Sequence, residues 1–171
     1  MSGIDLTCIP VFQDLSPAEL GKVREIFHEE ERPAGSVIMA EGQVGDEMFV
    51  LVRGQVQISK AMLLEGMTVP LLNMSTPRKV LATLKDNAYP VLGEVALIDA
   101  DHRSATVRAL TDCTFLVTSR DKFFGLAKRE PDIGVKLLLT LGRRMAATIR
   151  RSNAEVVKLT TALALSLRKG G

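Results

Sequence analysis

The chain has 171 residues, of which 46% are hydrophobic and 25% charged, and its net charge is +2. These values are typical of a globular protein with one main domain and appended helices. No apolar run reaches the roughly 18 to 20 residues that a membrane span needs, and the N-terminus lacks the basic start of a signal peptide. We therefore expect a cytoplasmic protein that makes no contact with a membrane.

Charge is distributed unevenly along the chain. From Arg120 onward, 12 Lys and Arg residues stand against 4 Asp and Glu residues, a balance of +8, so the preceding part carries −6. Such a basic segment is either the solvated face of a helix or a surface that attracts nucleic acid. Aromatic residues make up only 4% of the chain, with no Trp, which leaves little for base stacking. We favour the solvated helix.

The two cysteines, Cys8 and Cys113, lie far apart in the sequence and in apolar surroundings. Cytosolic cysteines in such surroundings stay reduced and pack as small hydrophobic side chains. The sequence therefore predicts two buried, reduced thiols and no redox chemistry.

Residues 5 to 31 are predicted to form short helices. Ser16 is followed by Pro17 and, at the third helical position, by Glu19, which is the pattern of a helix N-cap. The apolar residues that follow are spaced as one buried helix face: Leu20, Val23, Ile26 and Phe27.

From Arg32 to Thr118 the pattern changes to short alternating segments, which predict antiparallel strands. The predicted segments are Ser36 to Ala40, Met48 to Val52, Gln55 to Ser59, Val80 to Leu84 and Thr106 to Val117. Glycines at 35, 42, 45 and 54 fall between them, where turns need positive φ. Many short strands with regular turns indicate a sandwich or jelly-roll barrel, with residues 61–78 as an extended hairpin loop.

After Arg120 the helical period returns, with a short helix from Asp121 to Lys128 and a long one from about Asp132 to Leu167. The long helix carries a stripe of residues spaced by threes and fours: Leu138, Leu141, Met145, Thr148, Ser152, Val156, Leu159, Leu163 and Leu167. One small barrel cannot cover so long a stripe, which predicts a parallel homodimer through the long helices. Residues 1–130 should therefore form the main domain, and residues 131–171 the long helix.

The stretch with the clearest chemistry is 92–107, LGEVALIDADHRSATV. Gly93 precedes a helix-prone turn that starts at Glu94, and Arg103 is followed by small residues that enter a strand. Free N–H groups at such a turn bind anions, and Arg103 can contact phosphate oxygens in a bidentate manner. Glu94 can accept hydrogen bonds from a sugar hydroxyl. On these two residues alone, a structural ion pair stays an open alternative.

The whole stretch resembles the phosphate-binding cassette of the cyclic-nucleotide-binding family, which includes the bacterial catabolite activator protein and kinase regulatory subunits. That cassette reads approximately Gly-Glu-x-Ala-Leu, a short loop, and Arg-Ser/Thr/Ala-Ala-Thr-Val, and all of these positions are matched. The resemblance covers most of residues 5–152 and is missing mainly from 61–78. Its upstream parts are residues 9–16, 34–35, 41–49 and 52–56.

This resemblance implies a mainly β fold with flanking α-helices: an antiparallel jelly-roll or β-roll of about eight strands, N-terminal helices and a long C-terminal helix. It also implies that Glu94 receives the ribose 2′-hydroxyl and that Arg103 meets the cyclic phosphate. The residues that would complete the cassette are Gly93, Val95, Ser104 and Ala105.

In the catabolite-activator branch the long helix also reaches the purine, through a Thr one turn after an Arg-Arg pair. Here Arg143 and Arg144 are followed by Thr148 at that spacing. Thr148 and Ser152 either meet the base or water, or fix the helix register. Ile149 departs from the branch, which has a second hydroxyl there, so a weaker base contact is expected. A second departure is the turn at residues 86–91, which lacks the usual Gly-Asp.

The resemblance leaves two functional alternatives. In the first, the chain is a regulatory receptor in which a cyclic nucleotide changes the position or pairing of the long helix and so regulates an unidentified protein effector. In the second, it is a degenerate domain that dimerises and binds proteins without ligand. Intact Glu94 and Arg103 favour the first, and the turn at 86–91 keeps the second open. Ser104 in place of Thr favours cyclic AMP over cyclic GMP.

Three other functions lack the residues that they need. An iron–sulfur sensor uses about four cysteines, and the chain has 2. His28 and His102 are isolated, which argues against a metal-dependent jelly-roll enzyme. DNA recognition of the catabolite-activator type uses a further domain of roughly 60 to 80 residues after the long helix. We therefore expect no enzyme, no metal or cofactor, and no sequence-specific DNA binding.

Overall fold

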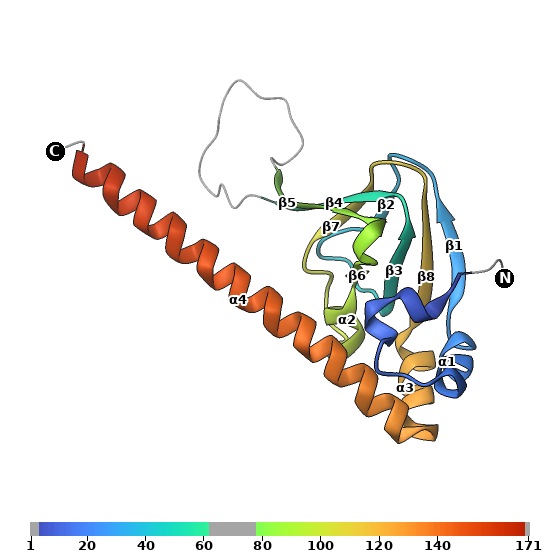
Figure 1. Cartoon of the computed structure of the whole chain (residues 1–171). Coiled ribbons are helices and arrows are strands. Elements are labelled where there is room, and N and C mark those ends of the chain that lie inside the picture. The colour runs from blue at the N-terminus through green and yellow to red at the C-terminus, as the bar shows by residue number, and fades with distance from the viewer. Residues whose placement is uncertain (1–3, 62–77, 170–171) are drawn as a thin grey trace.

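Two four-stranded antiparallel sheets form the body of the molecule in a computed structural model that describes residues 4–61 and 78–169 (Figure 1). The strand order is β1-β8-β3-β6 in one sheet and β2-β7-β4-β5 in the other. The strands are β1 (His28–Arg32), β2 (Val37–Met39), β3 (Glu47–Arg53), β4 (Gln55–Ala61), β5 (Arg78–Lys85), β6 (Val91–Leu92), β7 (Thr106–Ala109) and β8 (Cys113–Ser119).

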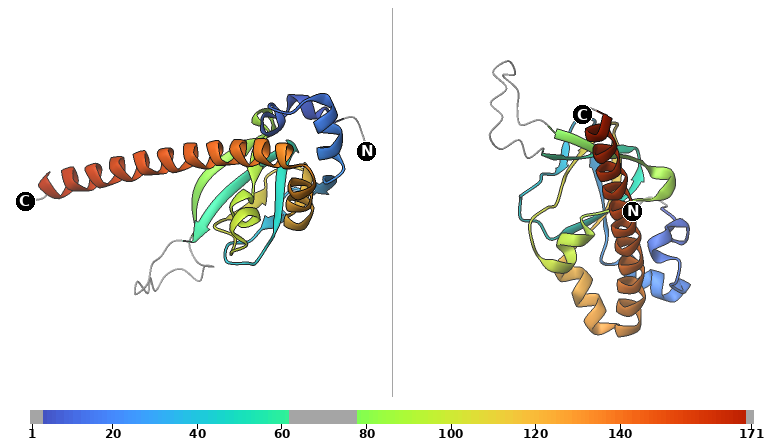
Figure 2. Two further views of the ribbon diagram at one scale, coloured as in Figure 1. Left: turned by 90° about the horizontal axis from the view of Figure 1, so that it is seen from below. Right: turned by 90° about the vertical axis from the view of Figure 1, so that its left-hand side faces the viewer.

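Helices flank these sheets and confirm the predicted fold class, a β-roll of about eight strands with N-terminal helices and a long C-terminal helix. The helices are α1 (Pro17–Arg24), α2 (Glu94–Asp99), α3 (Arg120–Arg129) and α4 (Pro131–Lys169), with 3-10 turns at Leu6–Cys8, Pro10–Phe12 and Asp86–Ala88. Figure 2 shows α4 extending far beyond the roll. Among the described residues, no helix is both long and apolar enough to cross a membrane.

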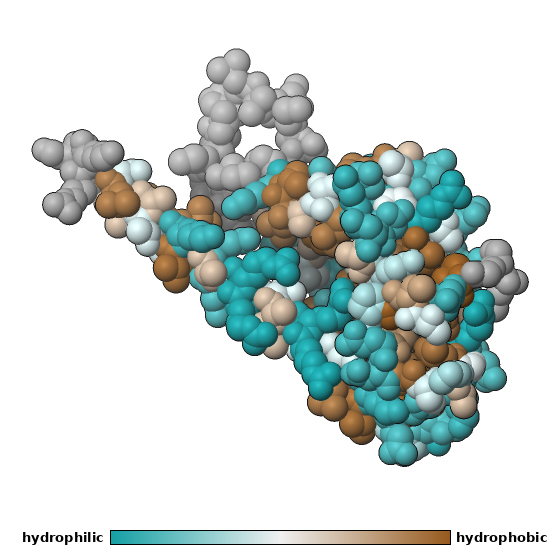
Figure 3. All heavy atoms as spheres, in the orientation of Figure 1, coloured by the Kyte–Doolittle hydropathy of each residue, from teal (hydrophilic) through white to brown (hydrophobic). Residues whose placement is uncertain are grey.

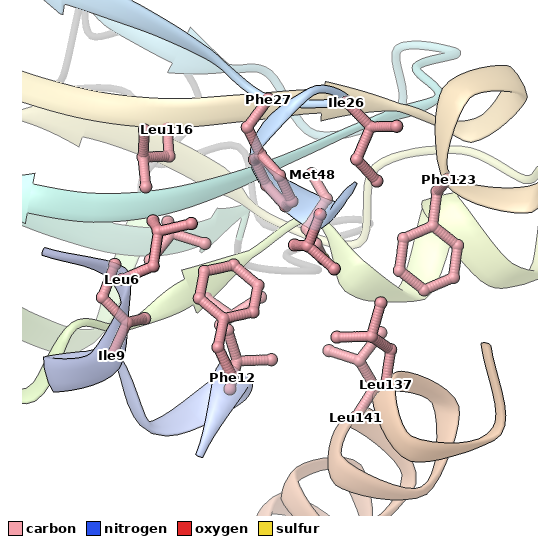
Figure 4. Packing of buried hydrophobic residues seen from close by; sticks show 14 of the residues in the cluster. Leu6, Ile9, Phe12, Ile26, Phe27, Met48, Leu116, Phe123, Leu137 and Leu141 are labelled. Carbon is pink, nitrogen blue, oxygen red and sulfur yellow. The ribbon is translucent and has the colours of Figure 1, made fainter. Parts of the chain in front are cut away.

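The hydrophobic core has two parts. One lies between the sheets, where Phe49 and Phe115 meet edge to face with ring centroids 5.8 Å apart. The other joins the roll to the helices and contains the edge-to-face pair Phe12 and Phe27, 5.5 Å apart. Figure 4 shows the helices α3 and α4 contributing Phe123, Leu137 and Leu141 to this second part. The first turns of α4 are therefore fixed to the roll by buried apolar area.

Polar contacts also hold α1 to α4. Ser16 and Glu19 form the predicted capping box, with the Ser16 N–H donating to Glu19 Oε2 (2.7 Å). Lys136 Nζ of α4 donates to both oxygens of the same carboxylate at 2.8 Å. The Lys136 contact and the Ser16 hydrogen bonds lower the pKa of Glu19 to about 2. This carboxylate thus caps one helix and binds the other.

Two predicted elements were wrong. Residues 28–31 were expected in a helix but form an edge strand that pairs with β8, from His28 opposite Val117 to Arg32 opposite Cys113. The segment from Thr106 to Val117 was expected as one strand, but the chain turns at residues 110–112 because β7 and β8 belong to different sheets. Both errors arise from tertiary pairing, which overrides a weak local pattern.

Two further expectations meet the structure only in part. Cys113 is buried as predicted, but Cys8 is exposed, because it lies in a 3-10 turn next to the surface residue Asp5. The predicted hairpin loop at 61–78 falls mostly on residues 62–77, which lie outside the described residues. Its two end residues, Ala61 and Arg78, are paired strand residues.

The predicted stripe of α4 is buried at its start and exposed where the helix extends beyond the roll. Leu141 is fully buried and Leu138 packs against the core, so the stripe begins on the side that faces the roll. Residues 147–167 are exposed, and their apolar side chains face solvent. Figure 3 shows hydrophobic residues along this projecting part of α4. A second apolar row that includes Val135, Leu139 and Ile149 is exposed along the helix.

Candidate ligand-binding site

The site is built around α2 and the loop that follows it. Leu92 of β6 pairs with Phe49 of β3, which places the start of α2 at the edge of the first sheet. Gly93 precedes the helix with a φ of 78°, and Ala100 ends it with a φ of 59°. Both residues are in the left-handed region, so the chain turns sharply at each end of a six-residue helix. These turns bring Glu94 and the segment from residue 101 to 105 to the same end of the roll.

Arg103 is held by its backbone and by its side chain. Its N–H donates to the Gln43 carbonyl (2.8 Å), and its carbonyl accepts from the Gly42 N–H (2.9 Å). Its guanidinium donates through Nη1 to the Glu47 carbonyl (2.7 Å). The residue is only 7% exposed. Three separate groups therefore fix a buried cation in the loop just before β7.

The guanidinium of Arg103 lies against two glycines. A Cβ added to either Gly45 or Gly93 would come closer than 3.0 Å to guanidinium nitrogens. Burial lowers the pKa of Arg103, while the nearby charges of Glu47 and Asp46 act in the opposite direction. The ion pairs of the described residues include none between Glu94 and Arg103, so the structural ion-pair alternative does not describe this site.

Replacing Gly93 with alanine is expected to lower the free energy of unfolding by about 2 to 3 kcal/mol, from backbone strain at positive φ and from overpacking. The new methyl group would collide with Arg103 Nη1 and the Glu47 carbonyl oxygen. The matched control is Gly42→Ala, where φ is 79° and nothing lies within 4 Å. That variant carries only the backbone strain, about 1 kcal/mol. Equal losses for the two variants in urea unfolding would contradict close packing at Gly93.

Glu94 is half-buried at the first turn of α2. Burial raises the pKa of its carboxyl group, although its own backbone N–H and the charge of Arg144 act in the opposite direction. Arg144 belongs to α4, which Figure 1 shows beside α2. The carboxylate of the cassette and the long helix therefore interact electrostatically.

The raised pKa of Glu94 predicts that Glu94→Gln stabilises the unliganded protein at neutral pH. The unfolded chain releases this proton near the ordinary value of 4.5 and the folded chain at a higher pH. The stability that the protonated group provides is therefore present below 4.5 and lost as the pH rises through the folded pKa. Thermal unfolding should show a higher Tm for the variant at pH 7 and no difference below pH 4.5.

The control for this prediction is Glu155→Gln, at an exposed position of α4. This substitution should leave Tm nearly unchanged at both pH values, because an exposed carboxylate loses little hydration on folding. A Tm of Glu94→Gln equal to or below that of the unmodified protein at neutral pH would contradict the expected cost of burying this charge.

A family model for the cyclic nucleotide-binding domain matches residues 29–130, more than half of the chain. The chain belongs to the cyclic nucleotide-binding domain family. It is 34% identical over 143 residues, 83% of its length, to a cyclic nucleotide-gated potassium channel of Mesorhizobium japonicum, and 32% identical over 128 residues, 75% of its length, to one of Rhizobium etli. The chain spans 35% and 31% of these two channels, about a third of their length.

The fold of the family is also found among solved structures. The catabolite activator protein of Thermus thermophilus matches with a TM-score of 0.72 and 24% identity, over 88% of this chain and 63% of that protein. A cyclic nucleotide-binding domain from Methylobacillus flagellatus matches with the same TM-score, over 84% of this chain and 73% of that one. The suspected resemblance to this family is thereby confirmed.

The structure gathers most of the predicted cassette residues around one loop. Gly93 touches Arg103, Val95 and Ser104 are exposed, and Ala105 is half-buried. Thr148 comes from α4, where it is exposed one turn after Arg144.

Sequence reasoning included residues 41–49 in the family resemblance but did not identify them as the loop that holds Arg103. Its members are Gly42, Gln43, Gly45 and Glu47, which provide backbone hydrogen bonds or the space for the guanidinium. Gly42 and Gly45 were also expected as turn residues. The local pattern did not reveal their closeness to Arg103, which lies 61 and 58 positions later.

The turn at residues 86–91 is ordered despite its departure from the usual sequence. Asp86 Oδ2 accepts from the Gly54 N–H (2.8 Å), and the Pro90 carbonyl accepts from the Leu51 N–H (2.9 Å). Tyr89 adopts a φ of 44°, the conformation that a glycine would take most easily. The hydrogen bond of Asp86 and the positive φ of Tyr89 thus form this turn without the usual Gly-Asp sequence.

Proposed function

We propose that this chain is a regulatory receptor domain that binds a cyclic nucleotide in the cytoplasm and has no catalytic activity of its own. The observation that carries the proposal is the buried guanidinium of Arg103, whose one hydrogen bond to protein in the described residues goes to the Glu47 carbonyl. A guanidinium has five N–H donors, so several are left for the oxygens of a cyclic phosphate. The proposed site residues are Gly93, Glu94, Val95, Arg103, Ser104, Ala105 and Thr148.

Each part of a cyclic nucleotide has a matching group in this site. The phosphate meets Arg103 and the small residues Ser104 and Ala105, which let the backbone approach. The ribose 2′-hydroxyl donates to the Glu94 carboxylate, and this hydrogen bond favours the ionised form that burial disfavours. Ser104 supports cyclic AMP over cyclic GMP.

Helix geometry supports a contact between Thr148 and the purine base. Residues seven apart in an α-helix lie almost two turns apart on the same side, so Thr148 lies on the side of Leu141. Leu141 faces the roll, and Arg144 on the next turn acts on Glu94. Thr148 thus lies on the roll-facing side of α4, just beyond the buried core. We place the base of a nucleotide held by the cassette next to its hydroxyl.

We also propose that α4 forms a parallel homodimer. Its exposed row follows a heptad, with the d positions at Val135, Gly142, Ile149, Val156 and Leu163 and the a positions at Leu139, Ala146, Asn153, Thr160 and Leu167. A single Asn at an a position fixes the register of a coiled coil. Val135, Leu139, Gly142 and Ala146 also line an apolar hollow on the helix surface. Unlike the predicted stripe, this row leaves the roll-facing side of α4 free for the nucleotide.

The charges beside this row support the parallel orientation. The e positions include Arg143 and Arg150, whereas the g positions are neutral, as at Met145 and Ser152. In a parallel pair each e residue faces a g residue, so these arginines meet neutral side chains. An antiparallel pair would place e against e and bring arginines together. Residues 1–130 would then be the receptor domain, and residues 131–171 the dimerisation and lid helix that signals to a protein effector.

Thermal unfolding with and without nucleotide tests the receptor proposal. A ligand that binds only the folded state stabilises it by about 2.7 kcal/mol at a hundred times its Kd, which raises Tm by roughly 5 to 10 °C at this size. Cyclic AMP should give such a shift after co-purified nucleotide has been removed, cyclic GMP a smaller one, and linear 5′-AMP almost none. No shift with either cyclic nucleotide would favour the dimerising interaction module.

A further inference from the structure

The C-terminal end of α2 is bound by an arginine from another helix. Arg120, the first residue of α3, donates through Nη1 to the carbonyls of Leu97 and of Ile98, the latter at 2.7 Å. These carbonyls belong to the last turn of α2, where no further helical N–H groups follow to donate to them. The guanidinium also lies over the Phe124 ring, 4.7 Å from its centre. Arg120 thus joins the cassette helix to α3.

The backbone of Arg120 makes a second link, toward the loop that holds Arg103. Its N–H donates to the Asp46 carbonyl (2.9 Å), and the next carbonyl along, that of Glu47, accepts from the Arg103 guanidinium (2.7 Å). Ser119 caps α3 just before this point, with its Oγ accepting from the Lys122 N–H. The start of α3 is therefore attached both to α2 and to the support of the phosphate-binding arginine.

The other side of α3 is packed closely on α4. A Cβ added to Gly134 of α4 would come closer than 3.0 Å to Ala127 of α3, so the two backbones approach at this point. Phe123 and Leu126 of α3 are buried in one cluster with Leu137 of α4. Since close-packed interfaces transmit a displacement instead of absorbing it, α3 and the first turns of α4 should move together.

We propose that Arg120 is the positioning residue through which nucleotide binding at α2 reaches α4. This inference rests on the proposed function, because a ligand at Glu94 acts at the N-terminal end of the same short helix whose C-terminal end Arg120 holds. A shift of α2 moves the carbonyls of Leu97 and Ile98. Arg120 carries that shift to α3, and the packing at Gly134 carries it to α4. The arginine contacts no nucleotide itself.

Hydrogen–deuterium exchange with and without saturating cyclic AMP tests this role in the full chain. In the unmodified protein, nucleotide should slow exchange both in α2 and in the first turns of α4. In Arg120→Ala, nucleotide should still slow exchange in α2, but the difference in α4 should fall at least threefold. An exposed cation on the same helix provides the matched control, and Lys122→Ala should behave as the unmodified protein does. An unchanged difference in α4 of Arg120→Ala would overturn the inference.

Arg120→Lys is a second variant that tests the inference if Arg120→Ala does not fold. Lysine retains the charge but lacks the planar fork that reaches two carbonyls and stacks on Phe124. We expect its nucleotide-dependent difference in α4 to be at least halved, and an undiminished difference would contradict the proposal. Absence of any nucleotide effect on α2 in the unmodified protein would instead refute the receptor function, and this inference with it. The two failures are thus distinguished by the response of α2.

Discussion

Arg103→Ala is expected to weaken cyclic AMP binding at least a hundredfold. In the proposed complex the substitution would remove two charge-assisted hydrogen bonds to the phosphate, each worth about 1.5 to 3 kcal/mol. Tenfold in affinity corresponds to about 1.4 kcal/mol. The glycines at 45 and 93 leave no other side chain to take its place. Displacement of a fluorescent cyclic AMP analogue measures the loss.

Two further variants separate the phosphate contact from a general loss of charge or fold. Arg108→Ala removes an exposed arginine of β7, the strand that follows Arg103, and should retain nearly full affinity because its guanidinium binds the Gly35 carbonyl. Arg103→Lys keeps the charge without the bidentate fork and should lie between the two. If Arg103→Ala, shown to be folded by its unfolding transition, bound as tightly as Arg108→Ala, the assignment of Arg103 to the phosphate would be wrong.

Leu163→Asp is expected to turn a dimer into a monomer at micromolar concentrations. Leu163 is 60% exposed and lies at a d position of the exposed row. A carboxylate there would lose its hydration in the helix pair without a partner charge, which costs several kcal/mol. Sedimentation equilibrium of the two proteins over a range of concentrations measures the change in dimer Kd, which should rise at least a hundredfold.

Leu165→Asp provides the matched control for this prediction. Leu165 is 56% exposed and only two residues further along, but a rotation of about 200° places it on the opposite side of the helix. Both variants remove one exposed leucine and add one charge to α4, so their helix propensities and net charges match. The dimer should persist in Leu165→Asp. Equal effects of the two variants, or a monomeric unmodified chain, would contradict the proposed heptad row.

The cassette could be predicted because its residues are continuous in the sequence. Gly93, Glu94 and Arg103 lie within eleven positions, and a glycine before a helix-prone turn is a local signal for the start of α2. The positive φ of Ala100 at the other end has no such signal. The cap at Ser16 and Glu19 was equally predictable, since it depends on residues three apart. Where a few neighbouring residues determine the local conformation, the sequence pattern alone predicted it.

Features that depend on contacts between distant parts of the chain could not be predicted from the local sequence pattern. The charged segment at residues 28–32 has no alternation and becomes a strand only because β8 offers an edge. The apolar residues of α4 all share helical spacing, but the sequence does not say which of them, such as Leu141, pack on the domain's own core. In the same way, the contact between Arg103 and the Glu47 carbonyl depends on how β3 and the cassette meet.

Calorimetric titration of the nucleotide-free protein with cyclic AMP is the most direct test of the central claim. The account predicts one nucleotide bound per chain with a micromolar or lower Kd, tighter than cyclic GMP and far tighter than 5′-AMP. Absence of binding heat for both cyclic nucleotides, repeated at a second temperature because the enthalpy can pass through zero, would contradict it. The chain would then be better explained as a dimerising interaction module built on this fold.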